Sequence, residues 1–173
     1  RRHPQAYIAT DDIYEHILWT EEKFHNILDV CPDLYDRTIV LNGVSKAYSM
    51  TGWRIGYCGG PKDLVDAMTN IQSQSTSNPT SISQVAAEAA LNGDQSCIGV
   101  MNKAFKERHD YVYATLKAMH GVDVAPADGT FYIFPSFQKV IERLGLGNDI
   151  AFAELLLSEV GVALVPGSAF GAE

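Results

Sequence analysis

Three short runs of apolar and β-branched residues lie in the first third of the chain, and each one adjoins polar side chains in a loop. The runs cover residues 6–10, 37–42 and 53–60. Runs of this length and composition predict buried β-strands. Open α/β sheets bind ligands with the loops at the ends of their strands. The polar residues beside these runs are therefore candidates for a binding site.

From Pro61 onward the apolar residues recur at helical spacing. A first helix is predicted to begin at Pro61, and a second begins after the pair 78–79 and ends at Gly93. Asp94 is a suitable cap for a third helix, which ends before Gly121. At roughly 25 residues and ~1.5 Å per residue, this helix would be about 40 Å long, enough to pass from one domain to another.

The pattern changes again beyond the third helix. Two strand-like pieces lie within residues 122–137, a helix is predicted over 149–160, and a final strand over 162–166. This mixture indicates a second, smaller α+β unit. The expected parts of this α/β chain are a large domain over 1–93, a connecting helix over 94–120 and a small domain over 121–173.

Composition narrows the class of protein. The chain has 173 residues, of which 46% are hydrophobic and 20% charged, with a net charge of -8. This is typical of a globular domain and disfavours nucleic acid or an anionic membrane surface as partner. Three cysteines without a CxxC pattern predict neither a disulfide framework nor a zinc site, and the five histidines lack the spacing of a metal site. No apolar run approaches the ~20 residues of a membrane helix.

Four side chains near the predicted strand ends could act together: Asp11, Tyr14, Lys46 and Arg54. An enzyme that uses a lysine amine as a nucleophile surrounds it with apolar residues or another cation, and an arginine holds a phosphate through paired hydrogen bonds. Each residue alone has a plainer explanation, as a solvated cation, an ion-pair partner, a turn cap or a packing aromatic. Their joint occurrence beside neighbouring strands favours a shared site.

The segment that holds the lysine carries a specific signature. GVSKAYSMTGWRIG, residues 43–56, resembles the lysine motif of the fold-type I aminotransferases that use pyridoxal phosphate, above all the aspartate aminotransferase branch. DDIYEHI at 11–17 is similar to that family's Asp-x-x-Tyr segment, and residues 126–134 and 161–171 are similar to its small-domain signatures. The resemblance covers essentially the whole chain. It implies part of a three-layer α/β/α large domain, followed by part of a smaller α+β domain.

The same resemblance implies a role for each candidate residue. Lys46 would form a Schiff base with pyridoxal 5'-phosphate and, once displaced by the substrate amine, carry the proton from the substrate α-carbon. Asp11 would pair with the pyridinium nitrogen, Tyr14 would donate to the phenolate oxygen, and Arg54 would bind the phosphate. Many members place a phosphate-binding hydroxyl three residues before the lysine. Gly43 stands there in this chain, so Ser45 is the candidate substitute.

The activity implied is amino-group transfer between an L-amino acid, aspartate-like or related, and a 2-oxo acid, in a cytoplasmic homodimer. The polar loop at 73–80 lies near the dimer interface in the family. The family's upstream half and its substrate-carboxylate arginine have no counterpart in the sequence. We therefore expect the chain to be the middle and later part of a subunit of roughly 400 residues, inactive by itself.

Other readings stay open at this point. A carbon-sulfur lyase, a synthase or a decarboxylase of the same fold would keep the same cofactor residues, because the cofactor does the electronic work and the surroundings choose the bond. An aminotransferase-like sensing domain of a transcription regulator would bind the cofactor without turnover. An inactive fragment would have no activity of its own.

Overall fold

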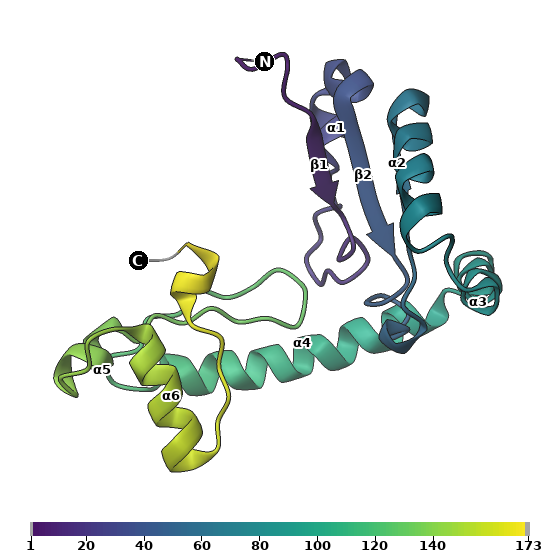
Figure 1. Ribbon diagram of the computed structural model, residues 1–173. Helices are drawn as coiled ribbons and strands as arrows, with labels where there is room; N and C mark the ends of the chain where they lie inside the picture. Colours follow the sequence, from purple (N-terminus) through teal and green to yellow (C-terminus); the bar gives the residue numbers. More distant parts are fainter. Residues whose placement is uncertain (1, 172–173) are drawn as a thin grey trace. The chain divides into compact units, whose positions relative to one another are not determined.

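The sheet of this protein has three strands, and its order places the second strand in the middle. In the computed structural model, which describes residues 2–171, β1 is Ile8–Asp11, β2 is Thr38–Gly43 and β3 is Gly56–Gly59. β1 and β2 are parallel, and β2 and β3 are antiparallel. Figure 1 shows β1 and β2 side by side. Because parallel strands end at the same edge, the loops after β1 and β2 begin next to each other.

All three strand predictions are confirmed, with ends shifted by one to three residues. The structure divides into two units, the first comprising residues up to 104 together with 128–130, and the second comprising 105–127 and residues from 131 onward. The first unit contains the whole sheet. Its buried apolar side chains are Ile17, Leu34, Ile39, Val44, Ala47 and Ala87.

Two short elements connect β1 to β2. α1 is Ile27–Val30, and Asn26 caps it by accepting a hydrogen bond from the backbone N–H of Leu28. The 3-10 helix η1, Pro32–Arg37, follows and contacts β2. The buried hydroxyl of Thr38 donates to the carbonyl of Leu34 at 2.8 Å, so this polar group is satisfied although it is buried.

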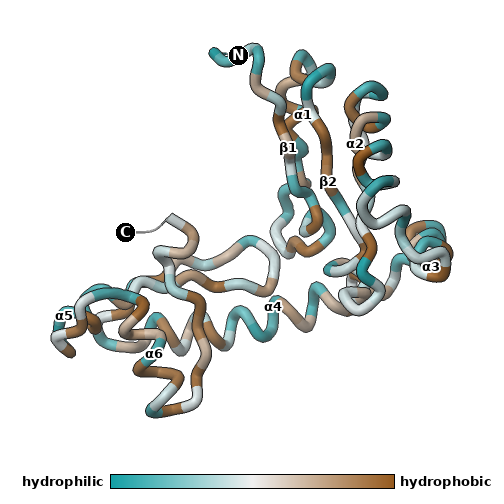
Figure 2. Tube along the Cα trace, viewed as in Figure 1, coloured by the Kyte–Doolittle hydropathy of each residue, from teal (hydrophilic) through white to brown (hydrophobic). Residues whose placement is uncertain are grey.

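Three longer helices follow the sheet, as the apolar spacing predicts. They are α2, Lys62–Ser75, α3, Ser81–Asn92, and α4, Ser96–Lys117. Asp94 accepts a hydrogen bond from the N–H of Ser96 at 3.0 Å, so the predicted cap of α4 is confirmed. Apolar residues recur along α2 in Figure 2, and several of them are exposed, such as Ile71 at 72%.

The second unit contains α5, Gln138–Arg143, α6, Asp149–Val160, and the 3-10 helix η3, Gly167–Phe170. Phe152 of α6 is buried, and its ring lies 5.0 Å from that of Phe137. Asn148 caps α6 through the N–H of Ala151. Over residues 2–171, no helix combines the length and apolarity that crossing a membrane requires.

The strands predicted within 122–137 and over 162–166 are wrong. In the described residues, the first region makes only isolated bridges, Asp123 with Ser136 and Gly129 with Leu18, and the second forms no strand. Both regions have a strand-like composition, but a strand also needs a neighbouring strand to pair with its backbone groups. The described part of the chain supplies no such neighbour here.

Candidate functional site

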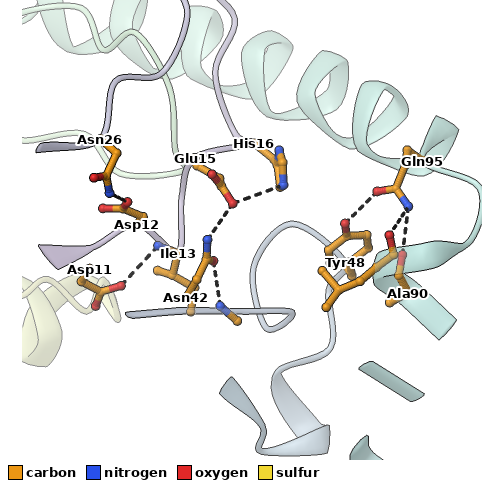
Figure 3. A network of polar contacts seen from close by, with 12 residues as sticks. Asp11, Asp12, Ile13, Glu15, His16, Asn26, Asn42, Tyr48, Ala90 and Gln95 are labelled. Atoms are coloured by element: carbon orange, nitrogen blue, oxygen red, sulfur yellow. Dashed lines mark hydrogen bonds and ion pairs between the residues drawn. The ribbon is translucent and has the colours of Figure 1, made fainter. Parts of the chain in front are cut away.

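The end of β1 presents two acidic residues in opposite ways. Asp11 is exposed, and its carboxylate accepts a hydrogen bond from the N–H of Ile13 at 3.2 Å, which turns the chain away from the sheet. Asp12 is buried and accepts from the hydroxyl of Thr10 at 2.7 Å. It also accepts from the side-chain amide of Asn26, a contact that Figure 3 shows. Of the two, only Asp11 offers its carboxylate to a ligand.

The loops after β1 and β2 bring Lys46 and Tyr14 together. The Nζ atom of Lys46 lies 5.7 Å from the centre of the Tyr14 ring, and both residues are half-buried. The neighbours of Lys46 in the chain hold it in place, because Val44 and Ala47 are both buried. An ammonium group over an aromatic face is a favourable contact, so the amine has a defined position.

Arg54 lies in a constrained segment that is tied to the lysine loop. It follows the 3-10 helix η2, Thr51–Trp53, in the left-handed conformation, with φ 50° and ψ 51°. Its Nη1 donates to the carbonyl of Thr51 at 2.9 Å, and the hydroxyl of Thr51 donates to the carbonyl of Ser45 at 3.1 Å. Ser49 in the same loop also has a positive φ, 53°. Non-glycine residues in this conformation are strained, and they gather at functional sites.

The first part of α4 supports both loops. Asn102 donates through Nδ2 to the carbonyl of His16 at 2.7 Å, in the loop after β1. Gln95, which lies directly before α4, accepts from the phenol of Tyr48 at 2.7 Å, in the loop after β2. The residues around Lys46 and Tyr14 are therefore braced from outside the sheet as well as by the strands.

Two phenols close to the site have shifted acidity. Burial raises the pKa of Tyr48, and electrostatic interactions with Cys97 and Glu15 raise it further. Burial also raises the pKa of Tyr57, with additional contributions from Glu15 and Tyr48. Both phenols therefore keep their protons over the whole physiological range, and Tyr48 donates its proton in a hydrogen bond to Gln95.

Sequence analysis missed two residues, Asn42 and Glu15, that connect the end of β2 to the loop after β1. Asn42 donates through Nδ2 to Oε1 of Glu15 at 2.6 Å and accepts through Oδ1 from the N–H of Gly43 at 2.7 Å. A signal was present, since Asn42 interrupts an otherwise apolar strand and Glu15 directly follows Tyr14. Their meeting could not be read from the sequence, because they are 27 positions apart.

Many members of the family carry a hydroxyl at the position of Gly43, and the structure gives a steric reason for the glycine here. It pairs with Gly56 across β2 and β3, and a Cβ atom there would lie 3.3 Å from both the Cα of Gly56 and the carbonyl oxygen of Ile55. The strands approach too closely at this point to admit a side chain without adjustment. The hydroxyl role assigned to Ser45 stays a prediction.

Known proteins with similar sequences show which family this chain belongs to. The family model described as "Aminotransferase class I and II" matches residues 1–173. The chain belongs to this family. It is 56% identical to the aspartate/prephenate aminotransferase of Nitrosomonas europaea over 100% of its length, and 45% identical to the aspartate aminotransferase of Rhizobium meliloti over 98%. It spans 45% of the first of these relatives and 43% of the second.

Solved aminotransferase structures match the fold. The aspartate aminotransferase of Rhizobium meliloti superposes with a TM-score of 0.92 at 43% identity, covering 99% of this chain and 44% of that one. The aspartate aminotransferase of Thermotoga maritima gives 0.83 at 40% identity, covering 99% and 42%. The predicted family and fold class, a partial aminotransferase fold of α/β type, are therefore confirmed. Class I and II aminotransferases use pyridoxal 5'-phosphate, the cofactor that the lysine motif predicts.

Proposed function

We propose that the whole protein is a pyridoxal-phosphate-dependent aminotransferase that moves an amino group between an L-amino acid and a 2-oxo acid. The observation that carries this proposal is the position of the Lys46 amine, 5.7 Å from the centre of the Tyr14 ring beside the ends of two parallel strands. Strand ends of this kind are where open α/β sheets bind ligands. The names of the relatives favour transamination over the lyase, synthase and decarboxylase alternatives.

The residues present fit pyridoxal 5'-phosphate. An amine, a phenol, an exposed carboxylate and a guanidinium are the groups that its aldehyde, phenolate, ring nitrogen and phosphate require, and Lys46, Tyr14, Asp11 and Arg54 supply them in two adjoining loops and the segment that follows. When bound, this cofactor supplies an aldehyde that amines attack and a ring that holds the electron pair left by the α-proton.

Lys46 has two tasks in this proposal. Its amine would hold the cofactor in the resting protein, and when it is not attached to the cofactor it would accept the proton from the substrate α-carbon. The neighbouring side chains restrict the motion of the amine, so it stays within reach of that carbon. Asp11 would pair with the ring nitrogen and keep it protonated, and Tyr14 would donate a hydrogen bond to the phenolate oxygen.

Arg54 holds the phosphate as a planar donor of paired hydrogen bonds, with Ser45 as a further donor from the lysine loop. The Nη1 contact with Thr51 already orients the guanidinium. By holding the phosphate, Arg54 would keep the cofactor bound when it is not attached to the lysine.

The substrates belong to the same proposal. The relative from Nitrosomonas europaea is named for aspartate and prephenate, which supports an aspartate-like amino donor and a 2-oxo acid acceptor. We also propose a homodimer in the cytoplasm. Exposed apolar side chains such as Ile71 and Val85 on α2 and α3 support contacts with further protein, and all three cysteines are free thiols, as a reducing compartment favours.

The domain assignment stays a prediction within this proposal. Residues 1–93 belong to the large cofactor-binding domain, 94–120 connect it to the small domain, and 121–173 belong to the latter. The polar loop at 73–80 is the candidate for contact across the dimer.

Reduction of the loaded protein tests the central claim. The whole protein, incubated with pyridoxal 5'-phosphate and reduced with borohydride, should carry the cofactor on the peptide that contains Lys46. Lys46→Ala should abolish both the label and transamination, whereas Lys103→Ala, which removes an exposed amine from α4, should leave both unchanged. A label on another lysine contradicts the proposal.

Arg54 has its own test. Arg54→Ala should speed the loss of cofactor on dialysis by about tenfold to a hundredfold, as expected for removing charge-assisted hydrogen bonds worth about 1.5–3 kcal/mol. Alanine and arginine share the same Cβ, so the strain at φ 50° is unchanged. Arg54→Lys should fall between the two, since an ammonium keeps the charge but not the paired geometry. Equal cofactor retention in the wild-type, Arg54→Ala and Arg54→Lys proteins would contradict the proposal that Arg54 binds the phosphate.

A further inference from the structure

The side chain of Asn42, near the end of β2, connects this strand to the loop after β1 and is fixed by a second hydrogen bond within its own strand. Nδ2 donates to Oε1 of Glu15 at 2.6 Å, and Oδ1 accepts from the backbone N–H of Gly43 at 2.7 Å (Figure 3). With its carbonyl and its amine engaged in opposite directions, the amide is held in one orientation. An asparagine oriented in this way acts as a rigid link between the groups that it contacts.

The two ends of this link lead to the two residues that the proposed function depends on. Glu15 directly follows Tyr14, and Gly43 lies three positions before Lys46. Gly43 itself is held by its pairing with Gly56 in the sheet, so the link fastens the Tyr14 loop to a fixed point on β2.

The surroundings of the link are half-buried and contain one central negative charge. The Glu15 side chain is 30% exposed, and its Oε1 also lies 3.4 Å from Nε2 of His16. The same carboxylate contributes to the raised pKa values of Tyr48 and Tyr57. Among the described residues, Glu15 interacts with His16, Tyr48, Tyr57 and Asn42. A hydrogen bond to a carboxylate in a partly water-free position is stronger than one between neutral groups.

We propose that Glu15 and Asn42 are positioning residues that hold the Tyr14 phenol and the Lys46 amine at their working separation. This inference rests on the proposed function, because that function gives the separation its meaning. Neither residue touches the reacting atoms. Their effect reaches the site through the backbone, by preventing the Tyr14 loop from moving along the edge of the sheet.

Adding a charge at Asn42 and then removing the charge of Glu15 tests whether the link positions the site or only stabilises the fold. Asn42→Asp still accepts from Gly43 but places a carboxylate against Glu15 at a spacing where only a donor fits, so the loops are driven apart. Adding Glu15→Gln restores a donor and an acceptor with the direction of the bond reversed, and the pair again carries one negative charge. Asn70→Asp, on the exposed surface of α2, adds the same charge outside the link and serves as the control.

The readout is the pH midpoint of the visible absorbance band of the cofactor attached to Lys46, measured in the whole protein. Asn42→Asp should raise this midpoint by at least about half a pH unit, because the phenol no longer meets the phenolate oxygen and a negative charge has been added. The double variant Asn42→Asp with Glu15→Gln should return most of the way to the wild-type value, and Asn70→Asp should not move it.

Two results would overturn the inference in different ways. A midpoint unchanged by Asn42→Asp, or a double variant no closer to wild type than the single one, means that the link does not position the site. If the wild-type protein takes up no cofactor on Lys46, the proposed function is wrong and the positioning role falls with it. Circular dichroism of each variant confirms that the midpoint is compared between folded proteins.

Discussion

Neighbouring residues of one type take different tasks in this protein. Asp11 and Asp12 are equivalent by composition, yet Asp11 is exposed at the strand end while Asp12 is buried beneath Thr10 and Asn26. Asp11 is the last residue of β1 and Asp12 begins the loop after it, so the two adjacent side chains meet different surroundings. The motif match assigns the ligand role to Asp11, and the exposure of its carboxylate agrees with that choice.

This difference is measurable. Asp12→Asn should lower the free energy of unfolding by about 2 kcal/mol, because the new amide hydrogens face a donor and leave buried groups unsatisfied. Asp11→Asn should change it by less than about 0.5 kcal/mol, as for most exposed substitutions, while transamination falls sharply. Urea unfolding of the whole protein beside an activity assay checks both. Equal stability losses in the two variants would contradict the assignment.

Gly129, which forms a bridge with Leu18 in the loop after β1, gives a second prediction. A Cβ atom on Gly129 would lie 2.2 Å from the carbonyl oxygen of Ile17, which accepts from the N–H of Thr130 at 2.8 Å. Gly129→Ala should therefore cost about 3 kcal/mol through a forced backbone shift. Gly99→Ala is the matched control, since nothing lies within 4 Å of its Cβ position in α4. That change should stabilise the helix by up to about 1 kcal/mol.

The local sequence pattern is sufficient to predict the helices of this protein but not all of its strands. Helices α2, α3, α4 and α6 form close to the predicted places, because caps and apolar spacing are local properties of a helix. The strands expected after residue 121 do not form, since pairing depends on a second segment that the pattern does not name. A strand-like composition predicts an element only where a partner strand is present.

The cap of α6 tests the local contribution. Asn148 accepts from the N–H of Ala151 at 2.9 Å, and the helix ends at Gly161 with φ 68°. Asn148→Ala should lower the free energy of unfolding by about 1 kcal/mol. Asn148→Ser should keep most of the stability that the cap contributes, because serine is also a good N-cap residue. Thermal or urea unfolding of the whole protein measures the difference. An alanine variant as stable as the serine variant would show that the cap contributes nothing.

Across the whole molecule, carboxylates that accept hydrogen bonds link folding to pH. The N–H of Ser168 lowers the pKa of Asp149, hydrogen bonds from Lys106 and His109 lower that of Asp110, and the hydroxyl of Ser96 lowers that of Asp94. These groups lie in both units. A depressed carboxylate pKa contributes stability that is present above its unfolded value and lost as the pH falls through the folded one.

Stability should therefore decline below about pH 4, the ordinary range of an aspartate. The pKa of Lys139 is raised by its hydrogen bond to Asp123, so its contribution is present below the ordinary lysine value and lost only at strongly alkaline pH. Urea unfolding of the whole protein between pH 7 and pH 3 measures the acid effect. Asp149→Asn should reduce the acid-dependent part of the decline, and an unchanged slope would contradict the role of Ser168.

The three strands, the helices α2, α3, α4 and α6, and the lysine motif with its cofactor are determined by the sequence alone, because apolar spacing, caps and a signature around Lys46 are each contained in a short stretch of chain. The tertiary structure decides which of two adjacent acids faces outward, whether a strand-like segment finds a partner, and that Glu15 meets Asn42. Each of these depends on groups brought together from distant positions. Hydrogen bonds and burial depend on proximity in space, which a local pattern does not contain.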